Sequence, residues 1–583
     1  MGIASAQRTI ALISKLPADA PMKPVIDSHY SKSSGIPSVI SQPFERVTPE
    51  SVGLSSEVVL SFIRTLHDDK SLKMHNVMIV KDGKCICDAS FGPYDPKIPQ
   101  YTFSACKSVT SIAIGCLIDE GKLSLDDNLA DIFKEELNNS EKLTVKKITV
   151  KNLLMMQSGM LFAEISSAAS EDWLKGFAGS IQASKPGTKF AYNSINTYIL
   201  ARIVAKISGI SLTDYLKKKI FKPLGITNYF WEKCPRGYAK GGWGLYIAIE
   251  DFAKLGVLLS HKGMWNGKRL LSEEYIEQAT SRQVSTPAEN GDFDYGFQIW
   301  SCRLCNAFLF NGMFGQNVLV FPDKDLVIVS TAGNNELFQK STYFGHVLRH
   351  FNSEDMYAIK GSKQNLQDYL DELKTTKLER FNYYTPPKEL DKVQDYCEKL
   401  DGKKLIPNTS QKFIMGFMDI CNQAVSNYFS KGLVSVEFSY ENGKLYASFE
   451  EPDKIFRIPV GFSDYEYAEV ILNNSVYKVA VLGRFTTDED GKDVLKIKID
   501  YLESPSTKIF KFKIDDIGIV MSEEDYPGET LITSTIRSYF QQNKKNPLIS
   551  SLNLDRIIYR AEQRAAPMIN MTIQDLLPQT EQQ

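Results

Sequence analysis

Alternating apolar and polar positions predict antiparallel strands in the first half of the chain. Val77–Val80 and Cys85–Ala89 are apolar runs on either side of a turn that contains Asp82-Gly83, a pair typical of β-hairpins. Asn317–Phe321 and Leu326–Ser330 form a second pair of such runs, separated by a Pro-Asp-Lys-Asp turn. The sequence therefore predicts a hairpin at each place.

Helical periodicity predicts two long helices between these strands. A mostly apolar run from Ser104 to Glu120 is followed by Gly121, where a helix C-cap glycine is expected. The run from Ile195 to Ser208 repeats isoleucine every four residues and is followed by Gly209. Strands and helices in one region indicate an α+β domain, to which we assign residues 45–355.

The pattern changes in the second half of the chain. A charged, helix-prone stretch that leads to Pro386-Pro387 is interpreted as a linker, residues 356–390. From Ser435 to Ile514 short alternating strands are separated by turn signals such as Asn442-Gly443. We therefore predict a mainly β, barrel-like domain over 391–583 with a helical tail, and a weakly ordered extension over 1–44.

Composition narrows the class of protein. With 583 residues, two or three domains are expected. The net charge of -2 gives no indication of a nucleic-acid or membrane partner, and no apolar run is long enough to span a bilayer. The first residues lack a signal-peptide core, so the cytoplasm is the expected location. The oligomeric state is not readable from the sequence.

The cysteines indicate reduced thiols. Nine cysteines are scattered along the chain, an odd number without a dense framework. Cys302 and Cys305 form the only Cys-x-x-Cys, and no second Cys or His pair lies near them in the sequence. We interpret them as ordinary buried thiols rather than as a metal or redox site.

The strongest candidate chemistry lies at the start of the first predicted helix. Ser104 and Lys107 are three residues apart and would lie on one helix face. A serine hydroxyl needs a base to act as a nucleophile at neutral pH, and the apolar neighbours of Lys107 favour its neutral amine. The Ser104 N–H, at a helix N-terminus, is a candidate oxyanion donor. Taken alone, the pair also fits a solvated first helical turn.

Two later segments supply candidate partners. Tyr192 lies on a turn directly before the second helix, where it could relay protons or simply pack beside a helix cap. Leu309–Gln316 reads as a strand with Gly312 and Gly315, and glycines there indicate a bulge or a close approach of backbone. The Met313 N–H is the candidate second oxyanion donor.

Taken together, these segments resemble the class C β-lactamases and related esterases, a superfamily of serine hydrolases. The resemblance rests on an ordered set of stretches, which are Glu50–Leu54, Ser104–Lys107, Ile114–Asp127, Ile148–Leu154, Ser158–Met160, Pro186-Gly187 before Tyr192, Gly241–Leu245, Asp251–Gly256 and Tyr295–Phe297. It implies a β-lactamase/transpeptidase-like antiparallel sheet with a helical subdomain. It also implies that Ser104 is acylated, that Lys107 and Tyr192 act as base and proton relay, and that the strand at Met313 completes the oxyanion hole.

Two departures from the family pattern affect the expected substrate. Ser194 stands where the family's Tyr-x-Asn has asparagine, and Asn311-Gly312 follow Phe310 where true β-lactamases have Lys-Thr-Gly. Because no cation stands there for a β-lactam carboxylate, we expect hydrolysis of small esters or short amides, without metal or cofactor. Ser194, Asn311, Gly312 and Gly315 are the predicted substrate-binding positions. The alternatives are a D-amino-acid peptidase or carboxypeptidase of the penicillin-binding type and a non-catalytic binding protein.

Overall fold

The chain forms two compact units, one that reaches residue 375 and one that begins at residue 392. A computed structural model describes residues 39–167, 170–335, 342–352, 356, 363–375, 392–408, 416–419, 430–472, 475–515, 518–527, 537, 540, 553–565 and 568–575. Most of the predicted extension, residues 1–38, lies outside these ranges.

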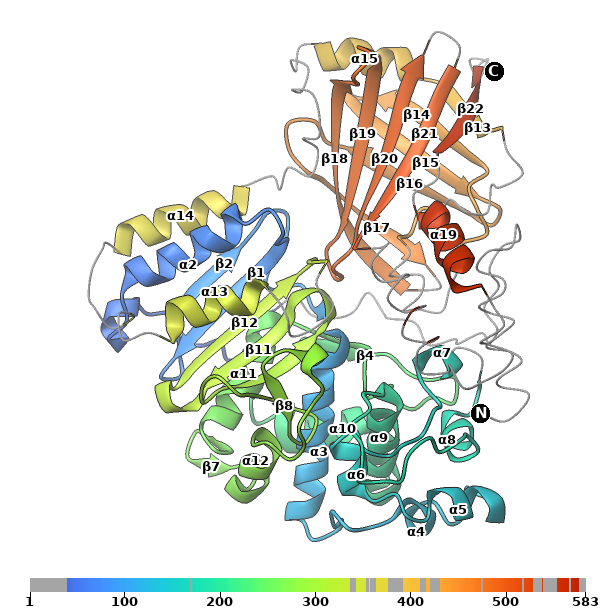
Figure 1. The fold of residues 1–583 in the computed structure, drawn as a ribbon. Coiled ribbons are helices and arrows are strands. Elements are labelled where there is room, and N and C mark those ends of the chain that lie inside the picture. Colours follow the sequence, from blue (N-terminus) through green and yellow to red (C-terminus); the bar gives the residue numbers. More distant parts are fainter. Residues whose placement is uncertain are drawn as a thin grey trace, which may run out of the picture. The chain divides into compact units, whose positions relative to one another are not determined.

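The first unit is built on a seven-stranded antiparallel sheet with strand order β2-β1-β12-β11-β10-β9-β8 (Figure 1). The strands are β1 (Met74–Lys81), β2 (Lys84–Ser90), β8 (Phe293–Tyr295), β9 (Trp300–Cys302), β10 (Phe308–Gly312), β11 (Gln316–Phe321) and β12 (Leu326–Ala332). Both predicted hairpins are confirmed, β1–β2 and β11–β12. The sheet is buried on both faces, because every residue of β1, β11 and β12 is buried.

Helices cover the two faces of this sheet (Figure 1). Helix α11 (Ile249–Ser260) packs on β1, β11 and β12, and Gly256 allows its backbone to approach two valines closely. Helix α2 (Ser56–Asp68) lies with α13 (Thr342–Phe351) and α14 (Lys363–Thr375). Helix α14 lies inside the stretch that the sequence indicated as a linker, and it packs on α2 and β2 of the first unit through buried leucines.

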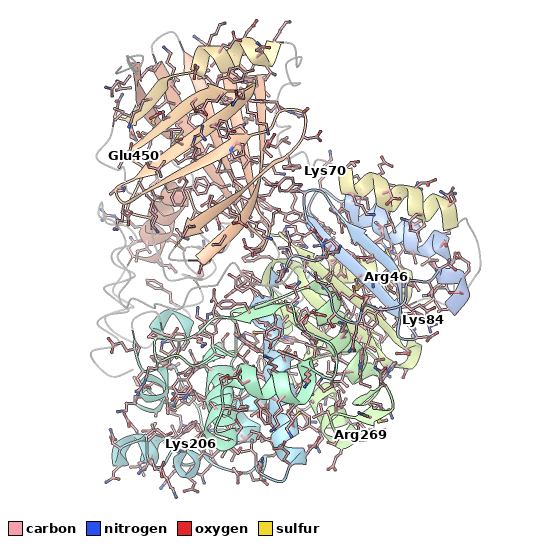
Figure 2. The ribbon with its side chains drawn as sticks, turned by 180° about the vertical axis from the view of Figure 1, so that it is seen from behind. Arg46, Lys70, Lys84, Lys206, Arg269 and Glu450 are labelled. Carbon is pink, nitrogen blue, oxygen red and sulfur yellow. The ribbon has the colours of Figure 1, made fainter. Side chains whose placement is uncertain are left out.

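An ion pair between Arg46 and Glu250 links the segment around Arg46 to α11. Arg46, labelled in Figure 2, donates from both terminal nitrogens to the two carboxylate oxygens of Glu250, at 2.6 and 2.7 Å. Hydrogen bonds of this charge-assisted, two-pronged kind are stronger and more directional than single ones. The segment therefore forms part of the first unit from Phe44 onward, where the Phe44 N–H also donates to Glu250.

A helical subdomain surrounds the two predicted long helices, α3 (Cys106–Asp119) and α9 (Ser194–Ser208), which contact each other. Its remaining helices are α4 (Leu129–Ile132), α5 (Asn139–Val145), α6 (Val150–Leu154), α7 (Glu164–Ser167), α8 (Trp173–Ala178) and α10 (Leu212–Leu216), which continues into η3 (Lys217–Phe221). Gly209 caps α9 with φ 75°, as predicted. A small sheet of β3 (Gln100–Tyr101), β5 (Leu245–Ile247) and β4 (Tyr229–Trp231) lies beside them.

The second unit is a nearly closed, barrel-like antiparallel sheet with strand order β16-β15-β14-β13-β22-β21-β20-β19-β18-β17. Its strands are β13 (Lys403–Pro407), β14 (Ser435–Glu441), β15 (Lys444–Glu451), β16 (Lys454–Val460), β17 (Glu466–Leu472), β18 (Ser475–Thr487), β19 (Asp493–Tyr501), β20 (Thr507–Asp515), β21 (Gly518–Tyr526) and β22 (Met568–Asp575). A bridge joins Gly461, which follows the edge strand β16, to Leu482 of β18 near the opposite edge. The predicted all-β, barrel-like domain is thereby confirmed.

Two helices accompany the barrel, α15 (Val393–Leu400) and α19 (Leu554–Ala565). The sequence indicated a helical tail, and the structure adds β22 after α19 as a barrel strand between β13 and β21. Among the described helices no single one is long and apolar enough to cross a membrane, although α9 and the α10–η3 segment, which are bent by 71° relative to each other, together pass on length and composition.

Candidate active site

Ser104 lies in a short turn at the entrance to α3. The prediction placed it in the first turn of that helix, but α3 begins at Cys106 and Ser104 belongs to the 3-10 turn η2 (Phe103–Ala105). Phe103 adopts φ 48°, a left-handed conformation that is strained for a bulky side chain. Two hydrogen bonds hold the start of this turn on β5, because the Thr102 N–H and hydroxyl both donate to the Leu245 carbonyl at 2.9 Å.

Lys107 contacts Ser104 directly. Its Nζ donates to Ser104 Oγ at 2.7 Å and to the Gly242 carbonyl oxygen at 2.7 Å, and the residue is 1% exposed. The predicted three-residue spacing therefore brings hydroxyl and amine into hydrogen-bond contact. A buried amine with neutral oxygen acceptors is suited to exchange a proton with the hydroxyl beside it.

Two further polar side chains of α3, those of Ser108 and Thr110, are also buried and donate to nearby backbone carbonyls. Ser108 Oγ donates to the Gln298 carbonyl at 2.8 Å, and Thr110 Oγ1 donates to the Gly241 carbonyl at 2.9 Å. Buried hydroxyls without partners are costly, so these bonds fix the loops that carry the carbonyls. Thr110 and Lys107 thus hold two successive carbonyls, those of Gly241 and Gly242.

Glycine is required at both positions of this loop. A Cβ on Gly242 would lie 2.6 Å from the Ser194 carbonyl oxygen, and one on Gly241 would lie 2.6 Å from the Ala201 Cβ. The loop therefore lies directly against α9, and any side chain would push its carbonyls away from α3. Gly242 is a site residue whose role the sequence did not predict, since it is far from Lys107 along the chain.

Tyr192 lies beside the lysine. Lys107 Nζ is 5.0 Å from the centroid of the Tyr192 ring, within cation–π range. The ring stacks on Trp300 of β9, with centroids 5.8 Å apart and an interplanar angle of 20°, and its edge meets Tyr295 at 6.3 Å. The structure therefore brings three predicted residues together, Ser104, Lys107 and Tyr192, and adds Trp300 as an unpredicted support.

The end of β10 lies against the Ser104 turn. A Cβ on Gly312 would overlap the Thr102 carbonyl oxygen and would lie 3.3 Å from the Ala105 amide nitrogen. Glycine at this position is thus needed for close contact between β10 and η2, as the sequence indicated. Met313 follows at the start of η5 (Met313–Gly315), so its backbone is next to the turn.

An aromatic pair connects the two candidate oxyanion donors. Phe103 precedes Ser104 and Phe314 follows Met313, and both have positive φ, 48° and 65°. Their rings meet edge to face with centroids 5.2 Å apart. Strained residues persist where packing holds them, and here each strained residue is adjacent to a predicted donor.

The remaining predicted positions lie around this centre in different ways. Ser194 is the first residue of α9 and is buried, with its carbonyl against Gly242. Asn311 donates from Nδ2 to Asn317 Oδ1 on β11 at 2.8 Å. Gly315 has φ 92°, and a Cβ there would lie 2.8 Å from the Ala332 Cβ of β12. Close packing therefore explains the glycine at this position.

Gln298 is a second site-supporting residue that the sequence did not predict. Its Nε2 donates to the carbonyls of Leu153 and Leu154 at 3.0 and 2.9 Å, and its Oε1 accepts from Thr197 Oγ1 at 2.5 Å. It therefore joins α6, α9 and, through Ser108, α3. Its positive φ of 62° has no signature in the sequence. Within the ranges that the structure describes, no group of three or more His, Cys, Asp or Glu side chains is arranged to hold a metal ion.

Comparisons with known proteins show the family of the segment that holds these residues. Residues 61–337 match the model of the beta-lactamase family. The chain contains a beta-lactamase-family domain. This segment holds Ser104, Lys107, Tyr192 and Met313, and it includes the seven-stranded sheet and the helical subdomain.

Relatives of this beta-lactamase-family domain include bacterial penicillin-binding proteins by name. PbpX of Bacillus subtilis (strain 168), provisionally named a penicillin-binding protein, is 27% identical over 245 residues, 38% of this chain and 61% of PbpX. Protein flp of Staphylococcus aureus (strain MRSA252) is 28% identical over 172 residues, 26% of this chain and 34% of flp. The chain thus spans less than two thirds of the length of either relative.

A solved structure from Bacillus anthracis, provisionally named a 6-aminohexanoate-dimer hydrolase, aligns with TM-score 0.43 and 22% sequence identity. The alignment covers 53% of this chain and 82% of the other chain.

Proposed function

We propose that the first unit is a serine acyl hydrolase that cleaves small esters or amides through an acyl-enzyme intermediate. The observation that carries this proposal is the 2.7 Å contact between Lys107 Nζ and Ser104 Oγ in a buried setting. A nucleophile within hydrogen-bond reach of a base, which is itself oriented by a third group, is the general signature of activated serine catalysis. The Gly242 carbonyl is the third group here.

The proposed reaction uses the residues in two stages. The neutral Lys107 amine takes the Ser104 proton while Oγ bonds to the substrate carbonyl carbon. The N–H groups of Ser104 and Met313 then donate to the oxyanion, and Tyr192 protonates the leaving group. Water then bonds to the acyl carbon and gives a proton to the Lys107–Tyr192 pair, which returns a proton to Ser104 Oγ as the bond between Oγ and the acyl carbon breaks. The short approach of Gly312 to the Ser104 turn supports this pairing of donors.

Hydrolysis of a short-chain p-nitrophenyl ester tests the proposal. We expect the wild-type protein to turn over the ester and Ser104→Ala to lose about 10³-fold or more of kcat, since removal of an activated nucleophile has effects of that order or larger. Ser281→Ala is the matched control, because Ser281 is an exposed serine whose hydroxyl donates to the Gln278 carbonyl and accepts from Gln283 Nε2, both close to it in the chain.

The comparison requires folded variants. Far-UV circular dichroism and thermal unfolding of all three proteins should coincide. Equal ester hydrolysis by wild type and Ser104→Ala would remove Ser104 from the mechanism. No turnover of any ester or amide by the folded wild type would favour the alternative of a non-catalytic binding protein that retains the fold.

The names of the relatives favour a second candidate, a D-amino-acid peptidase or carboxypeptidase. Asn311 argues against efficient β-lactam recognition. Its side chain is neutral and donates to Asn317, at the place where a cation would bind the carboxylate of a β-lactam. Fluorescent penicillin and a peptide ending in D-Ala-D-Ala separate the candidates. Covalent labelling of Ser104 together with release of D-alanine would favour the peptidase, and ester turnover without either would favour the esterase.

A further inference from the structure

The turn between β9 and β10 brings two thiols together. Cys302 is the last residue of β9, and Cys305 lies three residues later, before β10. The Cys305 thiol donates to Cys302 Sγ across 3.4 Å. Both residues are partly exposed, whereas the other described cysteines are buried, namely Cys85, Cys87, Cys106, Cys116, Cys234 and Cys397. The expectation that this pair is buried is therefore wrong.

Backbone hydrogen bonds fix the shape of this turn. The Cys302 N–H donates to the Ala307 carbonyl and the Ala307 N–H donates to the Cys305 carbonyl, both at 2.9 Å. Asn306 Nδ2 also donates to Asp323 Oδ1 at 2.6 Å. The two sulfurs are thus held near each other by a closed set of bonds between the strands. Their proximity follows from the fold of the hairpin.

The surroundings of Cys302 favour its thiolate. Its sulfur accepts from the Cys305 thiol and from the Leu304 N–H, each at 3.4 Å. The hydrogen bond from Cys305 lowers the pKa of Cys302 to about 7, against burial and the nearby Asp292 carboxylate, which raise it. The same contact raises the pKa of Cys305, and Lys324 opposes that rise.

The buried thiols behave in the opposite way. Burial raises the pKa of Cys85, Cys106, Cys116 and Cys397 to about 12. Thiolate, not thiol, is the reacting species in disulfide exchange, so at neutral pH the exchange chemistry of these groups concentrates on Cys302. Cys305 is then in place to resolve whatever bond Cys302 forms.

We propose that Cys302 and Cys305 form a redox-active dithiol site, which a low-molecular-weight disulfide such as oxidised glutathione converts into an intramolecular disulfide. Cys302 is the attacking sulfur and Cys305 the resolving sulfur. The sulfurs need to close from 3.4 Å to about 2.05 Å, which is within the reach of small side-chain rotations.

The exchange balances in two steps. The Cys302 thiolate bonds to one sulfur of oxidised glutathione, whose own S–S bond breaks, and the departing glutathione thiolate takes a proton. Cys305 then loses its proton to solvent and bonds to the Cys302 sulfur, which releases the second glutathione. The protein loses two electrons and two protons, and two molecules of reduced glutathione carry them away.

The test uses the full chain in a glutathione buffer poised to oxidise vicinal dithiols, followed by acid quenching, alkylation and mass spectrometry. Digestion after acidic residues keeps both cysteines on one peptide, which runs from Tyr295 to Asp323 and holds no other cysteine. We expect this peptide to lose two hydrogen atoms in mass and to resist alkylation, while the buried cysteines stay reduced. Cys397→Ser is the control and should behave as wild type.

Single-thiol variants distinguish the two roles. We expect Cys305→Ser to stop at a mixed disulfide between glutathione and Cys302, and Cys302→Ser to form neither a disulfide nor an adduct at a comparable rate. A wild-type peptide that stays fully reduced in the oxidising buffer would overturn the site. An adduct that forms at Cys305 in Cys302→Ser as fast as at Cys302 in Cys305→Ser would overturn the assignment. None of these readouts depends on hydrolase activity.

Discussion

Lys107 of the first unit and Lys508 of the second are both buried, but their surroundings differ. Lys107 in the first unit donates to the oxygens of Ser104 and Gly242, which are a hydroxyl and a carbonyl. Lys508 in the barrel is equally buried, at 1% exposure, and lies 3.1 Å from a Glu523 carboxylate oxygen and 3.2 Å from one of Asp525. One amine has neutral acceptors and the other has carboxylates.

This difference decides what each amine can do. Burial alone lowers the pKa of Lys508, but the charges of Asp525 and Glu523 more than offset it and hold the pKa above its usual value. Such a lysine stays protonated and serves as a structural countercharge. An amine among neutral oxygens keeps no such charge in place, so it can accept and return a proton. Under the proposed function, equal burial therefore serves catalysis in one unit and structure in the other.

The largest expected effect is on activity when Lys107 is replaced. Lys107→Met should lower kcat for ester hydrolysis by about 10²–10⁴-fold, the range attributed to a positioned general base. The unfolding midpoint should change little, since methionine fills a similar volume and the hydrogen bonds lost are those to a hydroxyl and a carbonyl oxygen. Steady-state kinetics and thermal unfolding of the same preparation measure both quantities.

Lys122→Met controls for the loss of a lysine as such, because Lys122 is exposed and bonds the side chain of Glu120 at 2.9 Å. This variant should keep wild-type kcat. A folded Lys107→Met protein with wild-type kcat would remove the base from the mechanism and leave the Lys107–Ser104 contact as a packing feature.

The next largest effect is on stability when Lys508 is replaced. Lys508→Met leaves Glu523 and Asp525 buried together without their cation, and breaking a buried pair costs about 3–5 kcal/mol. We expect chemical denaturation to show that loss in the transition of the second unit. Ester hydrolysis by the folded fraction should be unchanged. A stable Lys508→Met barrel would show that these carboxylates are protonated or hydrated, and the contrast with Lys107 would fail.

The sequence indicated much of this architecture because local patterns encode it. Hairpins with Asp-Gly turns, the isoleucine repeat of α9 and its Gly209 cap are all short-range signals. The three-residue spacing also brought Ser104 and Lys107 together correctly. The missed features depend on long-range contact. Gly242 meets Lys107 from a distant loop, and β22 pairs with β13 across more than half of the second unit's sequence.

Tyr192 offers a smaller effect that sharpens the account of the site. Its ring lies between Lys107 and Trp300, so Trp300→Leu should let the ring shift. Displacements near 1 Å can cost up to about 10²-fold, and we expect a loss of roughly tenfold in kcat with little change in KM. Trp300→Phe keeps an aromatic surface and should restore most of the rate. Equal losses in both variants would mean that Trp300 acts through general packing.

The smallest expected effect extends the comparison from amines to thiols. Cys302 in the first unit has hydrogen-bond donors at its sulfur, and Cys397 on α15 is buried in the hydrophobic core of the second unit. The pKa of Cys302 is lowered to about 7, below the usual thiol value, so its thiolate is lost as pH falls through 7. Its alkylation by iodoacetamide should therefore rise by about tenfold from pH 6 to pH 8 and level off above. Cys397, whose pKa burial raises to about 12, should react far more slowly at pH 8, and its alkylation rate should keep rising above that pH.

Peptide-resolved alkylation rates measure both thiols in one sample. Parallel profiles for the two would show that Cys305 and the Leu304 N–H do not act on Cys302 in solution, and the distinction between reactive and structural surroundings would then hold for the lysines alone.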